Sequence, residues 1–303
     1  MPDTTGSETV LHYFHIDPLS EHDGPGRRLV LFLQGCGLDC VWCHSPHSRP
    51  KRSPLLFFEA LCTACGRCEH ACPHGVHTIR ENRHLLQRTH CTGCGKCIEA
   101  CPDSSPEKMS GALVLPTRVA TVSDVFRKVR PYLDYIGASG GITFSGGEPL
   151  LQYKALAELA KRCKAAGYHV AIETSGIVAR KAVSAMIPYI DTWLVGMRLD
   201  TGSKRWNGTV LERKTCATLS LLREKSDARI IIRIPVVPSV TTTERYLEAA
   251  GRIIGRFTVT EIDILPYNRE TVHYYTAAGM PLRFECNFTE AEDEYMKMHS
   301  SLT

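Results

Sequence analysis

The 303-residue sequence predicts an α/β protein, a partial, TIM-like (β/α)6 barrel that is interrupted by a small cysteine-rich domain. Two observations lead to this prediction. Six short apolar segments alternate with segments of helical periodicity, an order typical of a parallel sheet. Between the first and second of these segments lies an internal repeat with four cysteines in each half. We therefore expect residues 1–52 and 107–303 to form the barrel, and residues 53–106 to form the insert.

The predicted strands are short apolar runs, and the predicted helices carry apolar residues at helical spacing. We expect strands at 29–34, 141–145, 168–174, 192–197, 229–237 and 259–265. We expect helices at 122–136, 152–167, 178–187, 210–225 and 243–254. Because parallel strands of such folds place chemistry at their carboxyl ends, the residues that follow the strands should meet at one mouth of the barrel.

Composition and charge narrow the classes of function. The net charge of +4 comes without a dense basic tract, and Arg49, Lys51 and Arg52 favour a solvated turn over a nucleic-acid site. No apolar run approaches the roughly 20 residues that cross a bilayer. The first ten residues, MPDTTGSETV, lack the basic and apolar regions of a secretory signal. We therefore expect a cytoplasmic protein with neither a membrane nor a nucleic acid as its partner.

Fourteen cysteines in a reducing compartment indicate metal binding instead of disulfides. Three of them (Cys163, Cys216 and Cys286) are isolated and are expected to be packing or surface residues. The runs CTACGRCEHACP and CTGCGKCIEACP both fit C-x2-C-x2-C-x3-C-P, which is specific for paired [4Fe–4S] clusters of the bacterial ferredoxin type. A zinc ribbon is the alternative, although its ligands come in pairs. In ferredoxins the fourth cysteine binds the cluster of the other run, which predicts the ligand sets Cys62, Cys65, Cys68, Cys101 and Cys72, Cys91, Cys94, Cys97.

The remaining cysteine group, QGCGLDCVWCHSP, has only three members, Cys36, Cys40 and Cys43. A third [4Fe–4S] cluster on these thiolates would have one iron without a protein ligand. An open coordination position is typical of a catalytic metal site, whereas the four-thiolate clusters of the insert suit electron transfer. The alternative is a fourth protein ligand from elsewhere, such as Cys163 or His44.

The motifs around this loop resemble the radical S-adenosylmethionine superfamily. The spacing C-x3-C-x2-C, with Trp42 before the last cysteine, is joined after the second strand by Gly146-Gly147-Glu148-Pro149. The resemblance implies that S-adenosylmethionine chelates the open iron and that reduction cleaves it to methionine and a 5′-deoxyadenosyl radical. It also implies that the two glycines let the backbone approach the methionine amino group, and that Glu148 accepts from this ammonium.

Within that superfamily, the sequence from about residue 12 to 270 is similar to the glycyl radical enzyme activating enzymes. The stretches that carry the similarity are DGPGR (23–27), FLQGC (32–36) and Cys43-His44. Some of these enzymes have a two-cluster ferredoxin insert at the place of 53–106. The resemblance implies a monomer that abstracts a hydrogen atom from a glycine of a partner glycyl radical enzyme, with flavodoxin or ferredoxin as electron donor.

The resemblance also implies a cofactor pocket at the strand ends. Arg233 matches an arginine that approaches the carboxylate of S-adenosylmethionine, the alternative being an exposed arginine at a strand end. The family's Asp-x-Lys after the fourth strand reads Gly196-Met197-Arg198, which loses a carboxylate that holds a monovalent cation in related activases. The family's Leu-Pro-Tyr-His ends in Asn268 here. The expected cofactor-contacting residues are Trp42, His44, Gly146, Gly147, Glu148, Glu173, Ser175, Arg198, Arg233 and Asn268.

Two other functions stay open at this stage. The departures at Gly196 and Asn268 leave room for a radical S-adenosylmethionine enzyme that acts directly on a small molecule, a peptide or a nucleic acid. A non-catalytic electron-transfer protein would hold a structural cluster on the three-cysteine loop. Segment 270–288 is expected to be a surface cover or a gate of the barrel mouth.

Overall fold

Six parallel strands form the central sheet in the computed structural model, which describes residues 8–108, 110–268 and 270–300. Residues 1–7 of the predicted first barrel segment lie outside this described part. The strands are neighbours in the order β14-β13-β12-β11-β10-β2, and every adjacent pair is parallel. The α/β prediction with six strand–helix units is therefore confirmed. The strands are β2 (Arg27–Leu33), β10 (Gly140–Gly146), β11 (His169–Thr174), β12 (Thr192–Gly196), β13 (Arg229–Pro235) and β14 (Glu261–Leu265).

Two further strands, β1 (Val10–Ser20) and β9 (Arg118–Thr121), extend this sheet beyond β2. β1 runs antiparallel to both β2 and β9. The sequence analysis did not predict either strand. β1 shows no clean alternation of apolar and polar residues, because its register against β2 shifts twice along its length.

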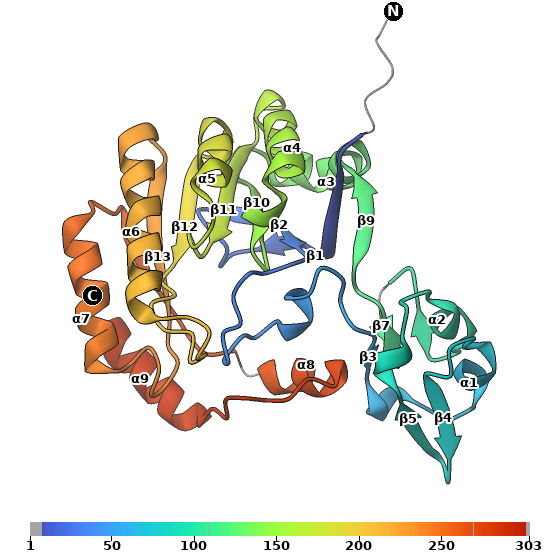
Figure 1. Cartoon of the computed structure of the whole chain (residues 1–303). Helices are drawn as coiled ribbons and strands as arrows, with labels where there is room; N and C mark the ends of the chain where they lie inside the picture. The colour runs from blue at the N-terminus through green and yellow to red at the C-terminus, as the bar shows by residue number, and fades with distance from the viewer. Residues whose placement is uncertain (1–7, 109, 269, 301–303) are drawn as a thin grey trace, which may run out of the picture.

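Five helices cover the outer face of the sheet (Figure 1). Side chains at the N-caps fix where three of them begin: Thr121, Asn207 and Thr243 accept hydrogen bonds from backbone N–H groups in the first turn. The helices agree with the predicted ranges to within a few residues. They are α3 (Val122–Ile136), α4 (Tyr153–Ala165), α5 (Arg180–Met186), α6 (Gly208–Lys225) and α7 (Glu244–Arg256).

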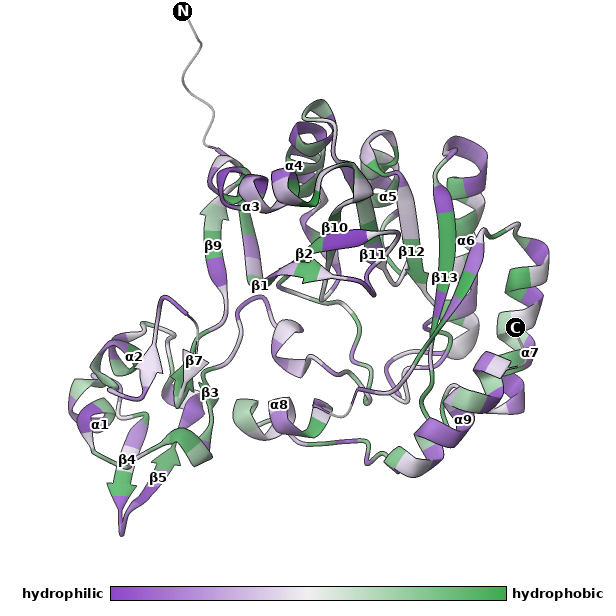
Figure 2. Ribbon diagram, turned by 180° about the vertical axis from the view of Figure 1, so that it is seen from behind, coloured by the Kyte–Doolittle hydropathy of each residue, from purple (hydrophilic) through white to green (hydrophobic). Residues whose placement is uncertain are grey.

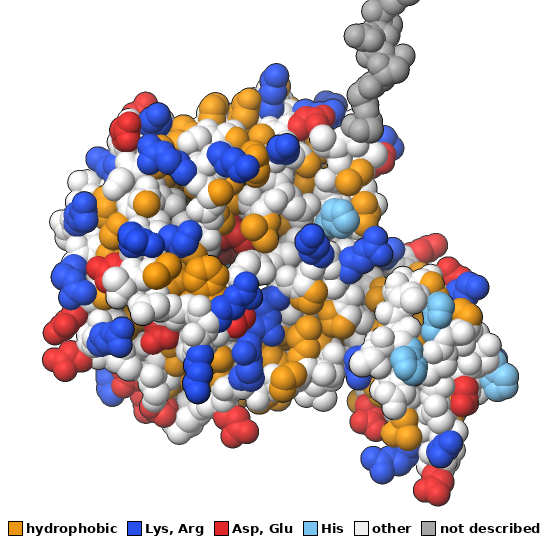
Figure 3. Space-filling view, viewed as in Figure 1, with side chains coloured by type: hydrophobic (Ala, Val, Ile, Leu, Met, Phe, Trp, Pro, Cys, Tyr) orange, Lys and Arg blue, Asp and Glu red, His pale blue; other side chains and the backbone are white. Residues whose placement is uncertain are grey.

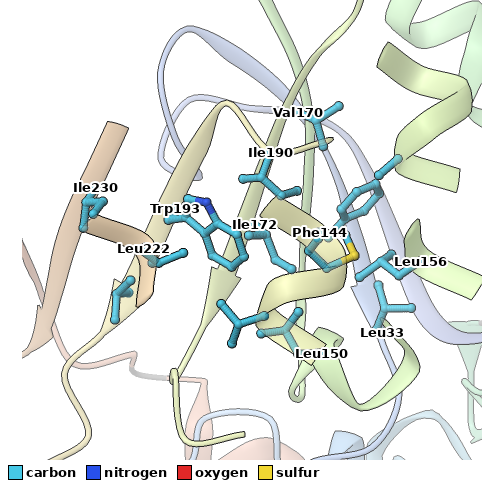
Figure 4. Packing of buried hydrophobic residues seen from close by; sticks show 14 of the residues in the cluster. Leu33, Phe144, Leu150, Leu156, Val170, Ile172, Ile190, Trp193, Leu222 and Ile230 are labelled. Atoms are coloured by element: carbon cyan, nitrogen blue, oxygen red, sulfur yellow. The ribbon is translucent and has the colours of Figure 1, made fainter. Parts of the chain in front are cut away.

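The main hydrophobic core lies between the sheet and these helices (Figure 4). Phe144 on β10 and Trp193 on β12 are fully buried there, and Figure 2 shows hydrophobic residues along β12 and β13. Burying a large apolar side chain contributes about 1.5–3 kcal/mol. This packed layer therefore holds the strands in place and leaves the loops at their carboxyl ends to form a site.

The cysteine-rich insert is a separate lobe beside the barrel (Figures 1 and 3). Its small core joins Leu55, Val76, Ile98 and Leu113 to Cys68 and Cys97, so the cysteines themselves are part of the packing. Its helices are α1 (Arg67–Ala71) and α2 (Lys96–Ala100), and its strand pairs are β3 (Leu56–Phe57) with β8 (Leu113–Val114), β4 (His77–Arg80) with β5 (Arg83–Leu86), and β6 (Ser104–Ser105) with β7 (Ser110–Gly111). Because β7 and β8 follow residue 106, the lobe continues beyond the predicted end of the insert.

Two C-terminal helices, α8 (Thr271–Ala278) and α9 (Phe288–Ser300), were not predicted. α8 connects the insert to the three-cysteine loop. Arg88 of the insert donates to the Ala277 carbonyl at 2.9 Å, and the Tyr275 hydroxyl donates to the Val41 carbonyl at 3.2 Å. Because Ala277 and Ala278 are each only 2% exposed, this part of segment 270–288 is a packed connection and not a plain surface cover. In the described residues, no helix has the length and apolar character needed to span a membrane.

Candidate active site

The loop after β2 brings Cys36, Cys40 and Cys43 to the carboxyl end of the sheet. Backbone hydrogen bonds fix it on both sides: the Cys36 N–H donates to the Arg49 carbonyl and the Val41 N–H to the Thr201 carbonyl, each at 2.9 Å. Because these hydrogen bonds hold the backbone at two separate points, the three thiols have defined positions.

The glycine turn after β10 packs directly against this loop. The Glu148 N–H donates to the Gly35 carbonyl at 2.8 Å. A Cβ atom on Gly147 would lie 2.3 Å from the same carbonyl oxygen. Only glycine permits this approach, so the turn and the cysteine loop form one continuous wall.

A cavity of about 910 Å³ opens beside the three thiols. This volume is typical of small-molecule sites, which measure about 300–1,000 Å³. The predicted convergence of strand-end residues at one mouth is confirmed. All the predicted contact residues except Glu148 line the cavity, together with the three cysteines: Cys36, Cys40, Trp42, Cys43, His44, Gly146, Gly147, Glu173, Ser175, Arg198, Arg233 and Asn268.

The three thiols are suited to a metal cluster. Burial raises the pKa of Cys36 and that of Cys40 to about 12, and it also raises the pKa of Cys43. Free thiols here would be neutral, whereas a bound metal deprotonates its thiol ligands. Cys163 is fully buried in the barrel core and does not line the cavity, so the structure rules it out as a fourth ligand. Three thiols that face a large cavity fit a cluster with one open iron.

The thiols of the insert fall into two groups. Burial raises the pKa of Cys68 to about 11, and Cys101 and Cys62 lie near enough to raise it further. Burial also raises the pKa of Cys97 to about 12, with further increases from Cys91, Cys72 and Cys94 and a smaller one from Cys68 of the first run. These neighbours are compatible with the predicted ligand sets, in which Cys101 joins the first run and Cys72 the second, and the sets stay a prediction.

Glu148 lies behind the cavity wall and holds two turns together. Its Oε1 accepts from the Thr174 hydroxyl at 2.7 Å and the Leu150 N–H at 3.2 Å, and its Oε2 accepts from the N–H and hydroxyl of Ser175 at 2.9 and 2.6 Å. Burial raises the pKa of this carboxyl group, while these hydrogen bonds lower it. Its position makes Glu148 a support for the loops after β10 and β11.

The substitution Glu148→Gln is expected to destabilise the protein by about 1–3 kcal/mol. Each carboxylate oxygen accepts one backbone N–H, so a glutamine amide in either orientation would place its NH2 group against a donor. Urea unfolding of the reconstituted protein measures this loss. Glu212→Gln is the matched control, since its exposed pair with Arg252 should contribute less than about 0.5 kcal/mol. Equal stability of the two variants would contradict the prediction.

Arg233 on β13 lies at the centre of a carboxylate network. Its side chain is 5% exposed and lies 3.3 Å from Glu173, 3.2 Å from Asp263 and 3.8 Å from Asp23. The alternative of an exposed strand-end arginine is therefore wrong. Burial raises the pKa of Glu173, but Arg233 and a hydrogen bond from Ser145 outweigh it and hold the pKa below its usual value. Three carboxylates around one guanidinium leave a negative wall that favours a cationic ligand.

Arg198 provides a second cation in the lining of the cavity. Its guanidinium lies over the Trp42 ring, 5.1 Å from the ring centroid, an arrangement typical of a cation–π contact. A Cβ atom on Gly196 would lie 2.9 Å from the Arg198 Nη1 atom, so the missing side chain gives the guanidinium its space. Among the residues that the structure describes, no carboxylate forms an ion pair with Arg198. This cation is therefore available to a ligand.

Two family models match the chain: a 4Fe-4S dicluster domain over residues 56–102 and the radical SAM superfamily over residues 101–274. The isethionate sulfite-lyase activating enzyme of Desulfovibrio desulfuricans is 32% identical over 277 residues, which are 88% of this chain and 86% of that protein. The chain belongs to the glycyl radical enzyme activating enzymes of the radical SAM superfamily.

Two further relatives are similar to this activating enzyme over nearly the whole chain. The indoleacetate decarboxylase activating enzyme of Tractidigestivibacter scatoligenes is 31% identical, with 88% of this chain and 86% of that protein covered. The choline trimethylamine-lyase activating enzyme of Oleidesulfovibrio alaskensis is also 31% identical, with 90% and 89% covered. Membership of the superfamily implies a [4Fe–4S] cluster and S-adenosylmethionine, and the dicluster domain indicates further clusters in the insert.

The sequence analysis missed two carboxylates of this activating enzyme's site, Asp23 and Asp263. Both line the cavity and contact Arg233. Asp263 had a visible signal, since it is an acidic residue between the apolar Ile262 and Ile264 of a predicted strand. Asp23 had no sequence signal apart from the DGPGR motif that contains it, because it lies in the loop between β1 and β2.

Proposed function

We propose that this activating enzyme binds S-adenosylmethionine in the 910 Å³ cavity and produces a glycyl radical on a partner enzyme. The observation that carries the proposal is the open face of the three-cysteine loop, which is directed into a cavity lined by carboxylates. A [4Fe–4S] cluster held by Cys36, Cys40 and Cys43 would supply the electron that cleaves the sulfonium. The relatives, which are activating enzymes for several different lyases and decarboxylases, support the kind of partner.

The residues of the chain would bind and orient the cofactor. The backbone around Gly146 and Gly147 would face its amino group, with Glu173 and Ser175 completing that wall. The acidic wall suits the positive charges of the amino and sulfonium groups. Arg233, Trp42, His44 and Asn268 line the same cavity and remain predicted contacts.

The direct test is activation of a partner without oxygen. The reconstituted protein, dithionite and S-adenosylmethionine are mixed with each glycyl radical enzyme of the same organism. We expect 5′-deoxyadenosine and an EPR doublet of a glycyl radical in equal amounts. Formation of 5′-deoxyadenosine with no radical on any such partner would favour an enzyme that acts directly on a small molecule. Absence of both products, with all clusters loaded, would favour the electron-transfer alternative.

We also propose that Arg198 replaces a monovalent cation and meets the carboxylate of S-adenosylmethionine. Arg198 has no carboxylate partner in the described residues, whereas Gly196 supplies no ligand for a metal ion. Cleavage of S-adenosylmethionine should therefore keep the same rate when sodium or tetramethylammonium replaces potassium. The Arg198→Ala variant should bind the cofactor about 10- to 100-fold more weakly, because a charge-assisted hydrogen bond is worth roughly 1.5–3 kcal/mol. A strong potassium requirement that Glu173→Gln abolishes would contradict this proposal.

The complete cofactor set would be three [4Fe–4S] clusters in a cytoplasmic monomer, with residues 53–106 as the two-cluster domain between barrel segments 1–52 and 107–303. Flavodoxin or ferredoxin would deliver electrons, and the insert would relay them. If so, Cys65→Ala and Cys94→Ala should each slow reduction of the catalytic cluster by flavodoxin more than tenfold. Dithionite reduction, which needs no relay, is the control. If flavodoxin reduces the catalytic cluster of both variants at the wild-type rate, the insert does not relay electrons and serves as a docking surface.

A further inference from the structure

The imidazole of His84 lies against two cysteines of the same predicted cluster. Its Nδ1 atom is 3.5 Å from the Cys62 sulfur, and its Nε2 atom is 3.7 Å from the Cys68 sulfur. His84 belongs to β5 and is only 8% exposed. The Phe57 ring closes the site at 4.6 Å between centroids. The ring is therefore held beside these sulfurs in a water-poor environment.

His77 on the paired strand β4 determines which nitrogen of His84 carries the proton. The two side chains are diagonal neighbours in the β4–β5 pair, and His77 Nδ1 lies 2.9 Å from His84 Nε2. An iron-bound thiolate has no proton, so His84 Nδ1 must carry one to donate to Cys62. In a neutral ring His84 Nε2 is then an acceptor, and His77 Nδ1 is the donor.

The last nitrogen of the pair is consistent with this order. His77 Nε2 is buried and has no hydrogen-bond partner within the described residues. In the assigned arrangement it carries no proton, and a buried lone pair without a partner costs less than a buried N–H without one. This arrangement of protons satisfies the His77–His84 and His84–Cys62 contacts, and it leaves His84 Nε2 and the Cys68 sulfur, 3.7 Å apart, without a hydrogen bond between them.

The second cluster has no corresponding group. Its predicted ligands are Cys72, Cys91, Cys94 and Cys97, and in the part of the chain that is described no side chain lies within hydrogen-bonding distance of their sulfurs. The first cluster has, in addition to His84, the Ala64 N–H at 3.4 Å from the Cys62 sulfur. The two halves of the internal repeat therefore differ in the donors around their sulfurs.

We propose that His84, positioned by His77, donates a hydrogen bond to Cys62 and gives the first cluster a higher reduction potential than the second. Hydrogen bonds to cluster sulfurs stabilise the reduced cluster, because it carries one more negative charge than the oxidised cluster. Reduction adds one electron to the cluster and moves no proton, since the Nδ1 proton stays on the ring. The electron comes from the same flavodoxin or ferredoxin. This inference rests on the proposed cofactor set, in which both insert clusters are present.

The test is a potentiometric titration of the full, reconstituted chain, followed by EPR of the reduced clusters. Cys65→Ala and Cys94→Ala identify the signals of the first and second cluster. The wild-type titration should show the first cluster reduced at the higher potential. In His84→Phe, at a fixed solution potential, the ratio of reduced to oxidised first cluster should fall by about tenfold, which corresponds to about 59 mV. The second cluster should not change. The control His90→Phe, at an exposed histidine beside Cys91, should change neither.

Unchanged potentials in His84→Phe, with iron content equal to wild type, would overturn the inference and leave the proposed cofactor set intact. Failure of the wild-type insert to hold any cluster would overturn both. If His84→Phe does not load its first cluster, labelling of histidine with ¹⁵N in the Cys94→Ala chain decides the question. The EPR signal of the first cluster, which is the one absent from Cys65→Ala, should then show coupling to a histidine nitrogen. A first-cluster signal without such coupling would refute the hydrogen bond.

Discussion

The substitution Cys40→Ala should abolish cleavage of S-adenosylmethionine, with no detectable 5′-deoxyadenosine under conditions in which the wild type completes many turnovers. Cys40 is 7% exposed and is one of only three cysteines that line the cavity in the described structure. Two thiolates cannot hold the cluster that the cofactor is expected to meet. Iron should fall from about 12 to about 8 atoms per chain, because the insert clusters use other ligands.

Cys216→Ala is the matched control for this experiment. Cys216 is half-buried on α6 and does not line the cavity, so its loss should leave both iron content and cleavage unchanged. Retention of 5′-deoxyadenosine formation in Cys40→Ala would show that the cofactor binds elsewhere. An equal loss in Cys216→Ala would show that the effect of Cys40→Ala is general instability.

The second large effect is expected from Arg233→Ala. This change leaves Asp23, Glu173 and Asp263 without their shared cation in a buried site. Breaking a buried ion pair in this way typically costs about 3–5 kcal/mol, which should lower the melting temperature by roughly 10 °C. Arg229→Ala, on the same strand, is the control. Its pair with Glu261 is about half exposed, so we expect a change within about 0.5 kcal/mol.

The destabilisation by Arg233→Ala should depend on pH. In the wild type the pKa of Glu173 is lowered in the folded state, so its contribution to stability is present above the unfolded pKa and is lost as the pH falls through the folded pKa. In the variant, burial is no longer offset by Arg233, and the folded-state pKa rises. The variant is therefore expected to be most destabilised at neutral pH and least destabilised near pH 4. Urea unfolding at both values measures this, and a loss independent of pH would contradict the electrostatic explanation.

Local sequence patterns were sufficient to predict the scaffold and the metal chemistry. Most of the parallel strands are buried apolar runs, whereas the edge strand β14 is only partly buried. A strand that is buried on both faces shows this apolar signature in its own sequence. The cysteine runs were equally readable, because ligands that share a cluster are close in sequence. Gly147 was readable as part of a motif, and the structure shows why glycine is needed there: any side chain would meet the Gly35 carbonyl.

Strands β1 and β9 and helix α8 could not be predicted in the same way. β1 is irregular in its pairing, and β9 is only four residues long. α8 packs with one side between the insert and the loop that precedes Cys43, through contacts of Arg88 and Tyr275. Periodicity reports the face that one element buries, and it gives no information about a helix whose surroundings come from two different parts of the chain.

The sequence by itself determined the α/β scaffold, the three cysteine groups and the order in which site residues follow the strands. Only the tertiary structure decided their partners. It placed Arg233 among three carboxylates, Arg198 over Trp42 beside Gly196, and His84 between His77 and Cys62. The physical reason is the range of the interactions. Helices, strands and cluster motifs depend on residues a few positions apart, whereas ion pairs and hydrogen bonds between side chains depend on how separate elements pack together.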